Sequence, residues 1–351
     1  MKKPSIRILG LCCFLVLAFP LAAQSTAVLT NPGNAVKPVT FTERLSDTWS
    51  KGWTNLGIYN IGTTLENAKT FIFVHKEKEG TTHVSQLAPN FRIGKRIYDE
   101  DWSAGWATIE VINAGAFKGF YHAKDGTGLE RAAAFKPGDG TYKGNVGEIN
   151  QKFAMTHAVS YSSGQEVYVF AYQKSDGYIE GRRVRDSTNS PFIRSDFATK
   201  IKPNLKGLEM IKRGNTWYLL GLDSSRHLWF YEVGSPDTGS DKAGKLVREA
   251  GVLEMGTNVD RIAVWADTYL LTLDQNADEL KVWEIADAAR GLSYPVTLSL
   301  AGLTDIGIEA DSMEPFSVID AANSTSYQGV VFVDSRSGSM KLIQVKYPIT
   351  N

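Results

Sequence analysis

Residues 55–87 decide the fold, because they read NLGIYN (55–60), TFIFVH (70–75), a turn at Glu79-Gly80, and THVSQL (82–87). Short runs of branched and aromatic residues that are separated by Asp, Asn or Gly turns are typical of β-strands joined as hairpins. The stretch therefore predicts three consecutive antiparallel strands.

The same module recurs along the chain. Further copies begin near residues 108, 156, 207, 260 and 314, about 50 residues apart, which is the length of one four-stranded blade. Segments 91–97 and 294–300 are the clearest candidates for the fourth strand of a blade. The sequence predicts an all-β fold, a six-bladed β-propeller of four-stranded antiparallel blades. A β-sandwich or two smaller β domains are the alternatives, because short strands alone do not separate these architectures.

The two ends of the repeat array complement each other. The sixth copy leaves no room for a fourth strand before residue 351, whereas an unassigned strand, PVTFTE (38–43), precedes the first copy. We expect this N-terminal strand to complete the last blade and cover its open edge. Helical periodicity is nearly absent; its best example, residues 284–290, predicts one or two helical turns in an interblade loop.

The first residues have the pattern of a secretory signal peptide. Lys2, Lys3 and Arg7 precede an apolar run that reaches Ala23, with small residues at its end. We expect cleavage near Ala23, a propeller domain over residues 24–351, and export to the periplasm or the extracellular space. Both cysteines, Cys12 and Cys13, lie in the segment removed, so we expect no disulfide and no cysteine metal site.

The bulk charge argues against some partners. Lys plus Arg and Asp plus Glu both number 38, and no basic cluster stands out. Binding to a phosphate backbone needs an excess of positive charge, so we expect no nucleic-acid partner. No segment after the signal peptide is apolar for long enough to span a membrane, so we expect no membrane span.

Two repeats open with the same string, Trp-Ser-x-Gly-Trp, at residues 49–53 and 102–106. With the apolar strand and the aromatic-rich strand that follow, this opening resembles the repeats of tectonin-like and fucose-lectin-like propellers. The resemblance covers the organisation of most of residues 24–351, but in detail only these two repeats.

The resemblance implies sugar sites in the clefts between neighbouring blades, where an aromatic ring stacks on the sugar and an Arg and a Glu bind its hydroxyl groups. The candidate ligand-binding residues are Trp49, Trp53, Trp102, Trp106, His122, Glu180 and Arg182. Packing is the other interpretation of the four tryptophans, because a Trp buries a large apolar area and a wedge between blades accommodates one.

No catalytic constellation stands out. The five histidines are His75, His83, His122, His157 and His227, and none has a helical zinc spacing. His75 and His122 are expected at matching places near the end of the second strand, where Tyr172 stands in the third copy. This match suggests a shared packing role, and a His/Tyr acid–base pair of a polysaccharide lyase is the alternative.

No nucleophile elbow and no phosphate-binding loop is present, so we expect no cofactor. The Asp-rich segments 274–278 and 334–338 superficially resemble calcium loops. Hairpin turns also favour Asp, Asn and Gly, and we therefore expect no metal there.

Three hypotheses for function follow. The favoured one is an exported, non-catalytic protein that binds glycan or a surface polysaccharide in the interblade clefts or at the channel mouth. The second is an exported carbohydrate-active enzyme, a lyase or a glycoside hydrolase, and the third is a protein-interaction scaffold at the cell surface.

Overall fold

The computed structural model describes residues 39–62, 67–114, 117–136, 139–150, 154–163, 166–184, 192–234, 244–289, 292 and 294–347. The proposed signal peptide, residues 1–23, lies outside these ranges. Within them, all regular structure is β, and no helix is long and apolar enough to cross a membrane.

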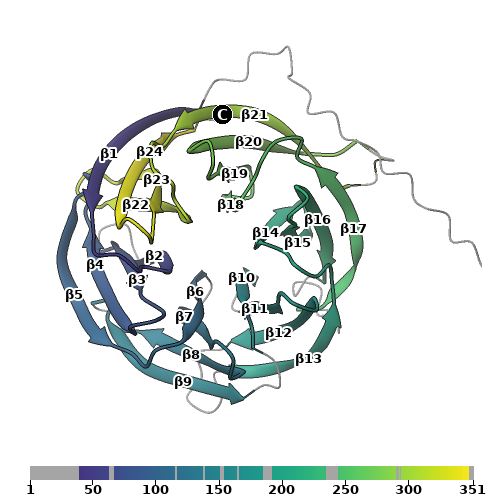
Figure 1. Ribbon diagram of the computed structural model, residues 1–351, viewed down its shortest axis with the longest axis horizontal. Coiled ribbons are helices and arrows are strands. Elements are labelled where there is room, and N and C mark those ends of the chain that lie inside the picture. Colours follow the sequence, from purple (N-terminus) through teal and green to yellow (C-terminus); the bar gives the residue numbers. More distant parts are fainter. Residues whose placement is uncertain are drawn as a thin grey trace, which may run out of the picture.

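Six four-stranded antiparallel sheets stand radially around a central axis (Figure 1). Blade 1 contains β2 (Asn55–Ile61), β3 (Lys69–His75), β4 (Thr81–Leu87) and β5 (Ile93–Asp101), from the axis outwards. Blade 2 contains β6 (Trp106–Ala114), β7 (Phe117–Lys124), β8 (Leu129–Phe135) and β9 (Tyr142–Asn150). Blade 3 contains β10 (His157–Ser163), β11 (Glu166–Gln173), β12 (Tyr178–Val184) and β13 (Phe192–Lys200).

The other three blades repeat the arrangement. Blade 4 contains β14 (Gly207–Arg213), β15 (Thr216–Leu222), β16 (His227–Val233) and β17 (Leu246–Glu254). Blade 5 contains β18 (Arg261–Trp265), β19 (Tyr269–Asp274), β20 (Glu279–Asp287) and β21 (Val296–Asp305). Blade 6 contains β22 (Ser312–Asp320), β23 (Thr325–Val333) and β24 (Ser339–Lys346), and β1 (Thr40–Thr48) is its outermost strand.

The pairing of β1 with β24 closes the ring, which confirms the expected closure by an N-terminal strand. The register runs from Thr40 opposite Lys346 to Thr48 opposite Ser339, with one irregularity between Glu43 and Leu45. In Figure 1 the purple β1 accordingly lies beside the yellow β24. The propeller fold is thus confirmed, and the two alternative all-β folds are excluded.

Two local expectations were inaccurate. Residues 284–290 were expected to contain a helical turn, but β20 continues to Asp287, which pairs with Val296 of β21. Two outer strands also begin two residues later than expected, β5 at Ile93 and β21 at Val296. Phe91 has a positive φ of 65° and still belongs to the turn before β5.

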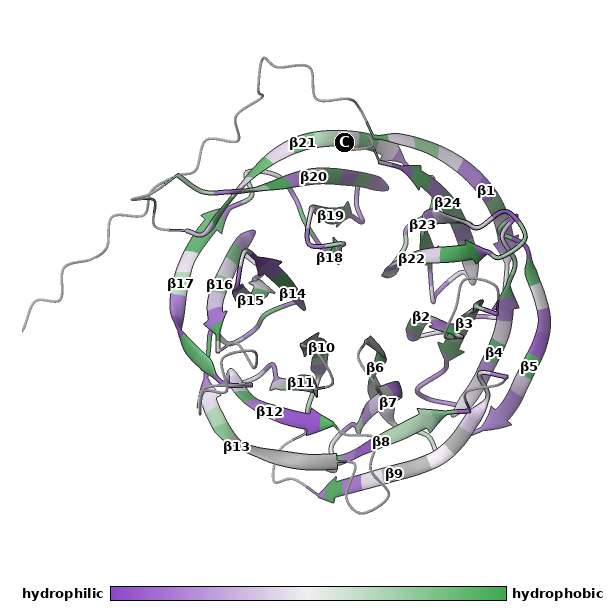
Figure 2. Ribbon diagram, turned by 180° about the vertical axis from the view of Figure 1, so that it is seen from behind, coloured by the Kyte–Doolittle hydropathy of each residue, from purple (hydrophilic) through white to green (hydrophobic). Residues whose placement is uncertain are grey.

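The core lies between the blades. Six clusters of buried apolar side chains each join residues of two neighbouring blades, so that every blade interface has its own cluster. Between blades 1 and 2, for example, Tyr59 stacks on Phe135 with ring centroids 3.8 Å apart. The outer strands β1 and β5 face solvent and carry hydrophilic stretches, as Figure 2 shows. Burial in six separate wedges explains why the repeats need one another for stability.

A short connector joins each blade to the next and docks on the preceding blade's hairpin turn. The amide N–H of Trp102 donates to the carbonyl of Gly80 (2.8 Å), and that of Gly105 donates to the carbonyl of Glu77 (2.8 Å). Trp49 and Gly52 bond in the same way to Gly338 (2.8 Å) and Ser335 (2.7 Å). Trp-Ser-x-Gly-Trp is therefore the form that this connector takes at two junctions.

Other junctions use aliphatic residues in the same connector. Ile201, Met255 and Ile306 donate to the carbonyls of Gly177, Arg226 and Asp278, respectively. Four residues further on, where Trp53 and Trp106 stand, these connectors carry Leu205, Val259 and Ala310, all buried. The second position of the connector is thus a core position whichever residue fills it.

The close approach of the connector restricts the turn. Gly80 has φ +82°, and a Cβ atom there would lie 1.9 Å from the carbonyl oxygen of Trp102. Only glycine fits both the dihedral angle and the space.

We expect Gly80→Ala to lower the free energy of unfolding by about 2 to 4 kcal/mol, because the new Cβ both strains the backbone and displaces the connector. The control is Gly126→Ala in the corresponding turn of blade 2, where φ is +65° and no atom lies within 4 Å. This control should cost only about 1 kcal/mol. Urea titrations of both variants measure the difference, and equal losses would contradict the role of the connector.

Candidate functional site

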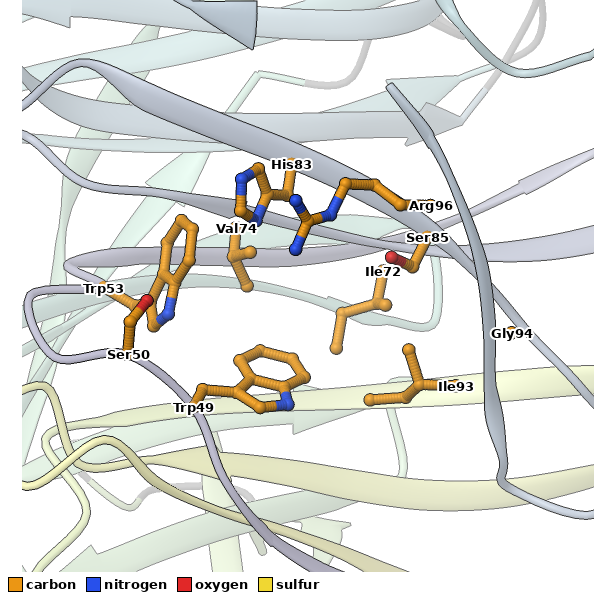
Figure 3. A pocket seen from close by; sticks show the side chains of 10 residues that line it. All are labelled: Trp49, Ser50, Trp53, Ile72, Val74, His83, Ser85, Ile93, Gly94 and Arg96. Atoms are coloured by element: carbon orange, nitrogen blue, oxygen red, sulfur yellow. The ribbon is translucent and has the colours of Figure 1, made fainter. Parts of the chain in front are cut away.

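The cleft between blades 6 and 1, here the blade 6–1 cleft, has a volume of about 380 Å³ and is lined by both tryptophans of the first connector (Figure 3). Trp49 is half-buried, whereas Trp53 is 3% exposed. Their rings meet edge to face, with centroids 6.5 Å apart and planes at 78°. The size is near the lower end for ligand sites, roughly 300 to 1,000 Å³.

Polar groups face the two rings across the blade 6–1 cleft. His83 of β4 lies over Trp53, with ring centroids 4.8 Å apart, and Arg96 of β5 lies beside it (Figure 3). Asp99 joins them: its Oδ1 lies 3.0 Å from Nε2 of His83, and its Oδ2 accepts a hydrogen bond from Nη1 of Arg96 (2.7 Å). The indole Nε1 of Trp53 is buried without a hydrogen-bond partner in the described part of the chain.

Burial and the nearby Arg96 lower the pKa of His83, and Asp99 counteracts this only in part. The hydrogen bond from Arg96 in turn lowers the pKa of Asp99. At neutral pH the imidazole is therefore neutral and Asp99 is charged, so that Nε2 of His83 donates its hydrogen to the carboxylate. The remaining Arg96 donors and the half-buried Trp49 ring are the groups that a ligand could use.

The cleft between blades 1 and 2, the blade 1–2 cleft, has the same framework but less space. The strand register places Trp102, Trp106 and Arg131 where the blade 6–1 cleft has Trp49, Trp53 and His83. Arg131 bonds to Glu148 (2.7 Å), as His83 does to Asp99. The volume is only about 160 Å³.

Trp102 largely fills the blade 1–2 cleft. Its ring packs on Phe73, Phe120 and Tyr142 with centroids 5.6 to 6.1 Å apart, and its Nε1 donates to the hydroxyl of Tyr98 (2.9 Å). Trp106 is 1% exposed. Trp106 thus lies in the core, and the half-buried Trp102 packs on three rings beside a small hollow, whereas Trp49 borders the larger cleft.

The structure corrects the proposed match between His75 and His122. His75 pairs with Asn55 and Thr82, whereas His122 pairs with Ile109 and Arg131, which is the register position of Val74 in blade 1. The two residues therefore point to opposite faces of their sheets. Burial lowers the pKa of His122 to about 3 and that of His75 to about 4, so both are neutral at pH 7.

Glu180 and Arg182 lie apart from the tryptophan clefts, between blades 2 and 3. Arg182 bonds to Glu130 of blade 2 through Nε (3.1 Å) and Nη2 (3.0 Å), and it also contacts Glu180. Tyr121 donates to Glu130 (2.8 Å). All three charged residues are at most 1% exposed, so this network joins two blades and presents no surface to a ligand.

The Asp-rich turns use their carboxylates internally. Oδ1 of Asp274 accepts from the amides of Asn276 (3.0 Å) and Ala277 (3.3 Å), and Oδ1 of Asp334 accepts from the amide of Arg336 (3.0 Å). Over the described ranges, no group of three or more His, Cys, Asp or Glu side chains could hold a metal ion.

Three glutamates, one from every second blade, occupy equivalent positions on the inner strands. Their proximity could not be recognised from the sequence. The register places Glu110 of β6, Glu209 of β14 and Glu314 of β22 where blades 1, 3 and 5 have Gly57, Val159 and Ala263. Oε1 of Glu110 accepts from the amide (2.9 Å) and the hydroxyl (2.7 Å) of Ser160 in blade 3. The first of these bonds satisfies an otherwise unpaired amide at the inner edge of the blade 3 sheet.

Burial raises the pKa of all three carboxyl groups, that of Glu110 to about 7, and mutual repulsion adds to the effect for Glu209 and Glu314. Carboxyl groups with raised pKa values are common at functional sites, although structural burial produces them too. Here the hydrogen bonds to the next blade give Glu110 a structural role.

No protein-family model matches the sequence, and no curated protein matches it. Among solved structures, the β-propeller domain of Cps50 (Swd1) from Myceliophteria thermophila is similar, with 12% identity, a TM-score of 0.50, and coverage of 87% of this chain and 100% of that domain. The periplasmic gluconolactonase PpgL of Pseudomonas aeruginosa is also similar, with 16% identity, a TM-score of 0.50, and coverage of 83% and 88%. A chain of the polycomb repressive complex 2 has 9% identity, a TM-score of 0.51, and coverage of 84% and 70%.

These similarities agree with the strand topology, which defines the class of the molecule as a six-bladed β-propeller. The similar propellers have unrelated functions, and such low identities show the fold alone.

We expect the contribution of Glu110 to the stability of the protein to fall as the pH rises from about 4.5 to 7. The folded-state pKa of Glu110 lies above the unfolded value, so its protonated form stabilises the fold at low pH, and this contribution is lost as the pH passes 7. Glu110→Gln keeps an acceptor for Ser160 and removes the titration. At pH 8 the variant should be more stable than the wild type by about 1 to 2 kcal/mol, and at pH 4.5 the two should be equal.

Urea unfolding at several pH values measures this difference. Glu148→Gln is the control, because Glu148 is 44% exposed. A difference between Glu110→Gln and the wild type that does not change with pH would show that Glu110 does not titrate in this range.

We expect Arg182→Met to cost about 3 to 5 kcal/mol, because it leaves two buried carboxylates without a cation. A triple variant that also carries Glu130→Gln and Glu180→Gln should recover most of this loss. Thermal melts of both proteins test the expectation, which fails if the single and triple variants are equally unstable.

Proposed function

We propose that the protein is an exported, non-catalytic binding protein whose blade 6–1 cleft holds a sugar unit of a glycan or surface polysaccharide. The observation that carries the proposal is the half-buried Trp49 ring, which borders an open cleft and faces Arg96 and His83. An aromatic face beside a few fixed polar groups suits a sugar ring, which has an apolar face and hydroxyl groups at its edge.

The polar groups of the cleft fit hydroxyl recognition. The Arg96–Asp99–His83 arrangement presents donors and an acceptor whose positions are set by hydrogen bonds to one another. Lys76 lies over the ring of Trp53, 5.0 Å from its centroid, and holds that ring in place. Because Trp53 is buried, Trp49 offers a ligand more apolar surface than Trp53 does.

The first cleft is a stronger candidate than the second. Trp102 fills the blade 1–2 cleft and already uses its indole N–H on Tyr98. A single site therefore agrees better with the geometry than one site for each Trp-Ser-x-Gly-Trp connector. The likeness of the N-terminal residues to a signal peptide supports a location where extracellular glycans are available.

A glycan array with residues 24–351 identifies a ligand, and calorimetry with that ligand measures its affinity. We expect Trp49→Ala and Arg96→Ala each to weaken binding at least about tenfold, since each removes a contact worth roughly 1.4 kcal/mol or more. The matched control is Arg248→Ala on β17, an exposed arginine that, like Arg96, bonds to one carboxylate.

The expected pattern is loss in the two cleft variants and none in the control, with unchanged melting temperatures for Arg96→Ala and Arg248→Ala. An array without any bound glycan, or a bound glycan that all three variants retain, would overturn the proposal. Turnover of a bound polysaccharide would instead favour the carbohydrate-active enzyme.

A further inference from the structure

Two hollows adjoin on the face of the propeller where the inner strands begin. The first, the channel mouth, has a volume of about 260 Å³ and is lined by the first residues of all six inner strands. The second lies at blades 5 and 6, has a volume of about 410 Å³, and is here called the blade 5–6 hollow. Arg261 and Asp311 line both, so the two spaces meet at this pair.

Most charges around the two hollows are neutralised by neighbours. Lys206 bonds to Asp260 (3.1 Å), and Arg336 bonds to Glu309 (2.8 Å). Nε2 of His157 donates to the carbonyl of Lys206 (3.1 Å). Burial lowers the pKa of His157 to about 4, so this residue is uncharged at pH 7. These groups therefore offer no uncompensated positive charge.

Arg261 differs from these residues. Its Nε donates to the backbone carbonyl of Asp311 (2.9 Å), which fixes the guanidinium. Over the described residues it forms no ion pair, and neither of its Nη groups has a hydrogen-bond partner, although the side chain is half-buried. A half-buried cation normally has an anion beside it, since desolvation of an unpaired charge is costly.

We propose that the blade 5–6 hollow is a binding site for the carboxylate of a hydroxy acid such as a sugar acid, with Arg261 as its anchor. A guanidinium presents two parallel N–H groups that match the two oxygens of a carboxylate. With Nε held by Asp311, the two Nη groups are the donors that remain for such a ligand.

The surrounding groups select among anions. The carboxylate of Asp311 accepts from the amide of Ser335 (3.2 Å), and Glu309, which bonds to Arg336, also lines the hollow. A doubly charged ligand such as phosphate is repelled by these two carboxylates, whereas a single carboxylate can be held and hydroxyl groups can donate to them. Gln275, whose Nε2 donates to the carbonyl of Ala310 (2.8 Å), keeps its own carbonyl oxygen as a further acceptor.

This site is separate from the blade 6–1 cleft and does not depend on the proposed function. The blade 6 hairpin turn lies between them: the carbonyl of Gly338 bonds to Trp49, whereas Arg336 lines the blade 5–6 hollow. Variants of one site should therefore leave the other intact.

Calorimetry of residues 24–351 with galacturonate, galactose and inorganic phosphate tests the proposal. We expect saturable binding of galacturonate that weakens with salt, and none of phosphate. Galactose should not compete with galacturonate. The affinity for galacturonate should fall at least tenfold in Arg261→Gln and by a smaller factor in Arg261→Lys, which keeps the charge but loses the fork.

Arg226→Gln is the matched control, because Arg226 is an exposed arginine on a hairpin turn that forms no ion pair over the described residues. It should bind galacturonate like the wild type, and so should Trp49→Ala. Unchanged affinity in Arg261→Gln, equal binding of phosphate, or loss of galacturonate binding in Trp49→Ala would overturn the proposal. The carboxylate could belong to a free acid or to a polymer, and titration with polygalacturonate distinguishes the two. Binding of polygalacturonate that is also lost in Arg261→Gln would identify a polymer as the ligand.

Discussion

The backbone hydrogen bonds between each connector and the preceding hairpin turn are the constraint on which the rest of the structure depends. They fix where one blade ends and the next begins, and they hold the second connector position against the wedge between blades. The turn must admit a positive φ and a close backbone contact, which is why Gly80 and Gly338 stand where they do. Cleft geometry follows from this docking, because the first connector position borders the cleft and the second lies beneath it.

Fold and closure could be predicted because they depend on repetition, which is visible in a single sequence. Six modules of even spacing and one unassigned strand are enough to define a closed ring, and only strand ends such as Ile93 and Asp287 deviate. The segment before residue 291 looked helical because its Ala residues favour a helix, but pairing with β21 outweighs that local preference.

The candidate site could be predicted only in part. Its two tryptophans follow from a repeated motif. His83, Arg96 and Asp99 instead meet because of the strand register, and a shift of one residue in that register would turn each side chain to the other face of the sheet. The same sensitivity explains why His75 and His122 looked equivalent. Burial also cannot be read from residue type, so Glu180 and Arg182 resembled ligand contacts although they bind each other and Glu130 between two blades.

The two Trp-Ser-x-Gly-Trp connectors show how one motif serves two purposes. Both dock on the preceding turn in the same way, but Trp102 turns into a wall of aromatic rings while Trp49 borders a cleft with Ile93 where the other has Tyr142. A sequence motif thus identifies the connector, and the neighbouring strands decide whether space remains for a ligand.

The position of the blade 6–1 cleft at the seam of the ring has a thermodynamic consequence. One wall belongs to the first blade, and the connector that carries Trp49 follows directly from β1, the strand that pairs with the end of the chain. A molecule in this cleft would contact that connector and blade 1 together, and would hold the connector in its docked position. Binding would therefore stabilise the segment that begins directly after the ring-closing strand, so that occupancy of the cleft and docking of this segment are linked equilibria.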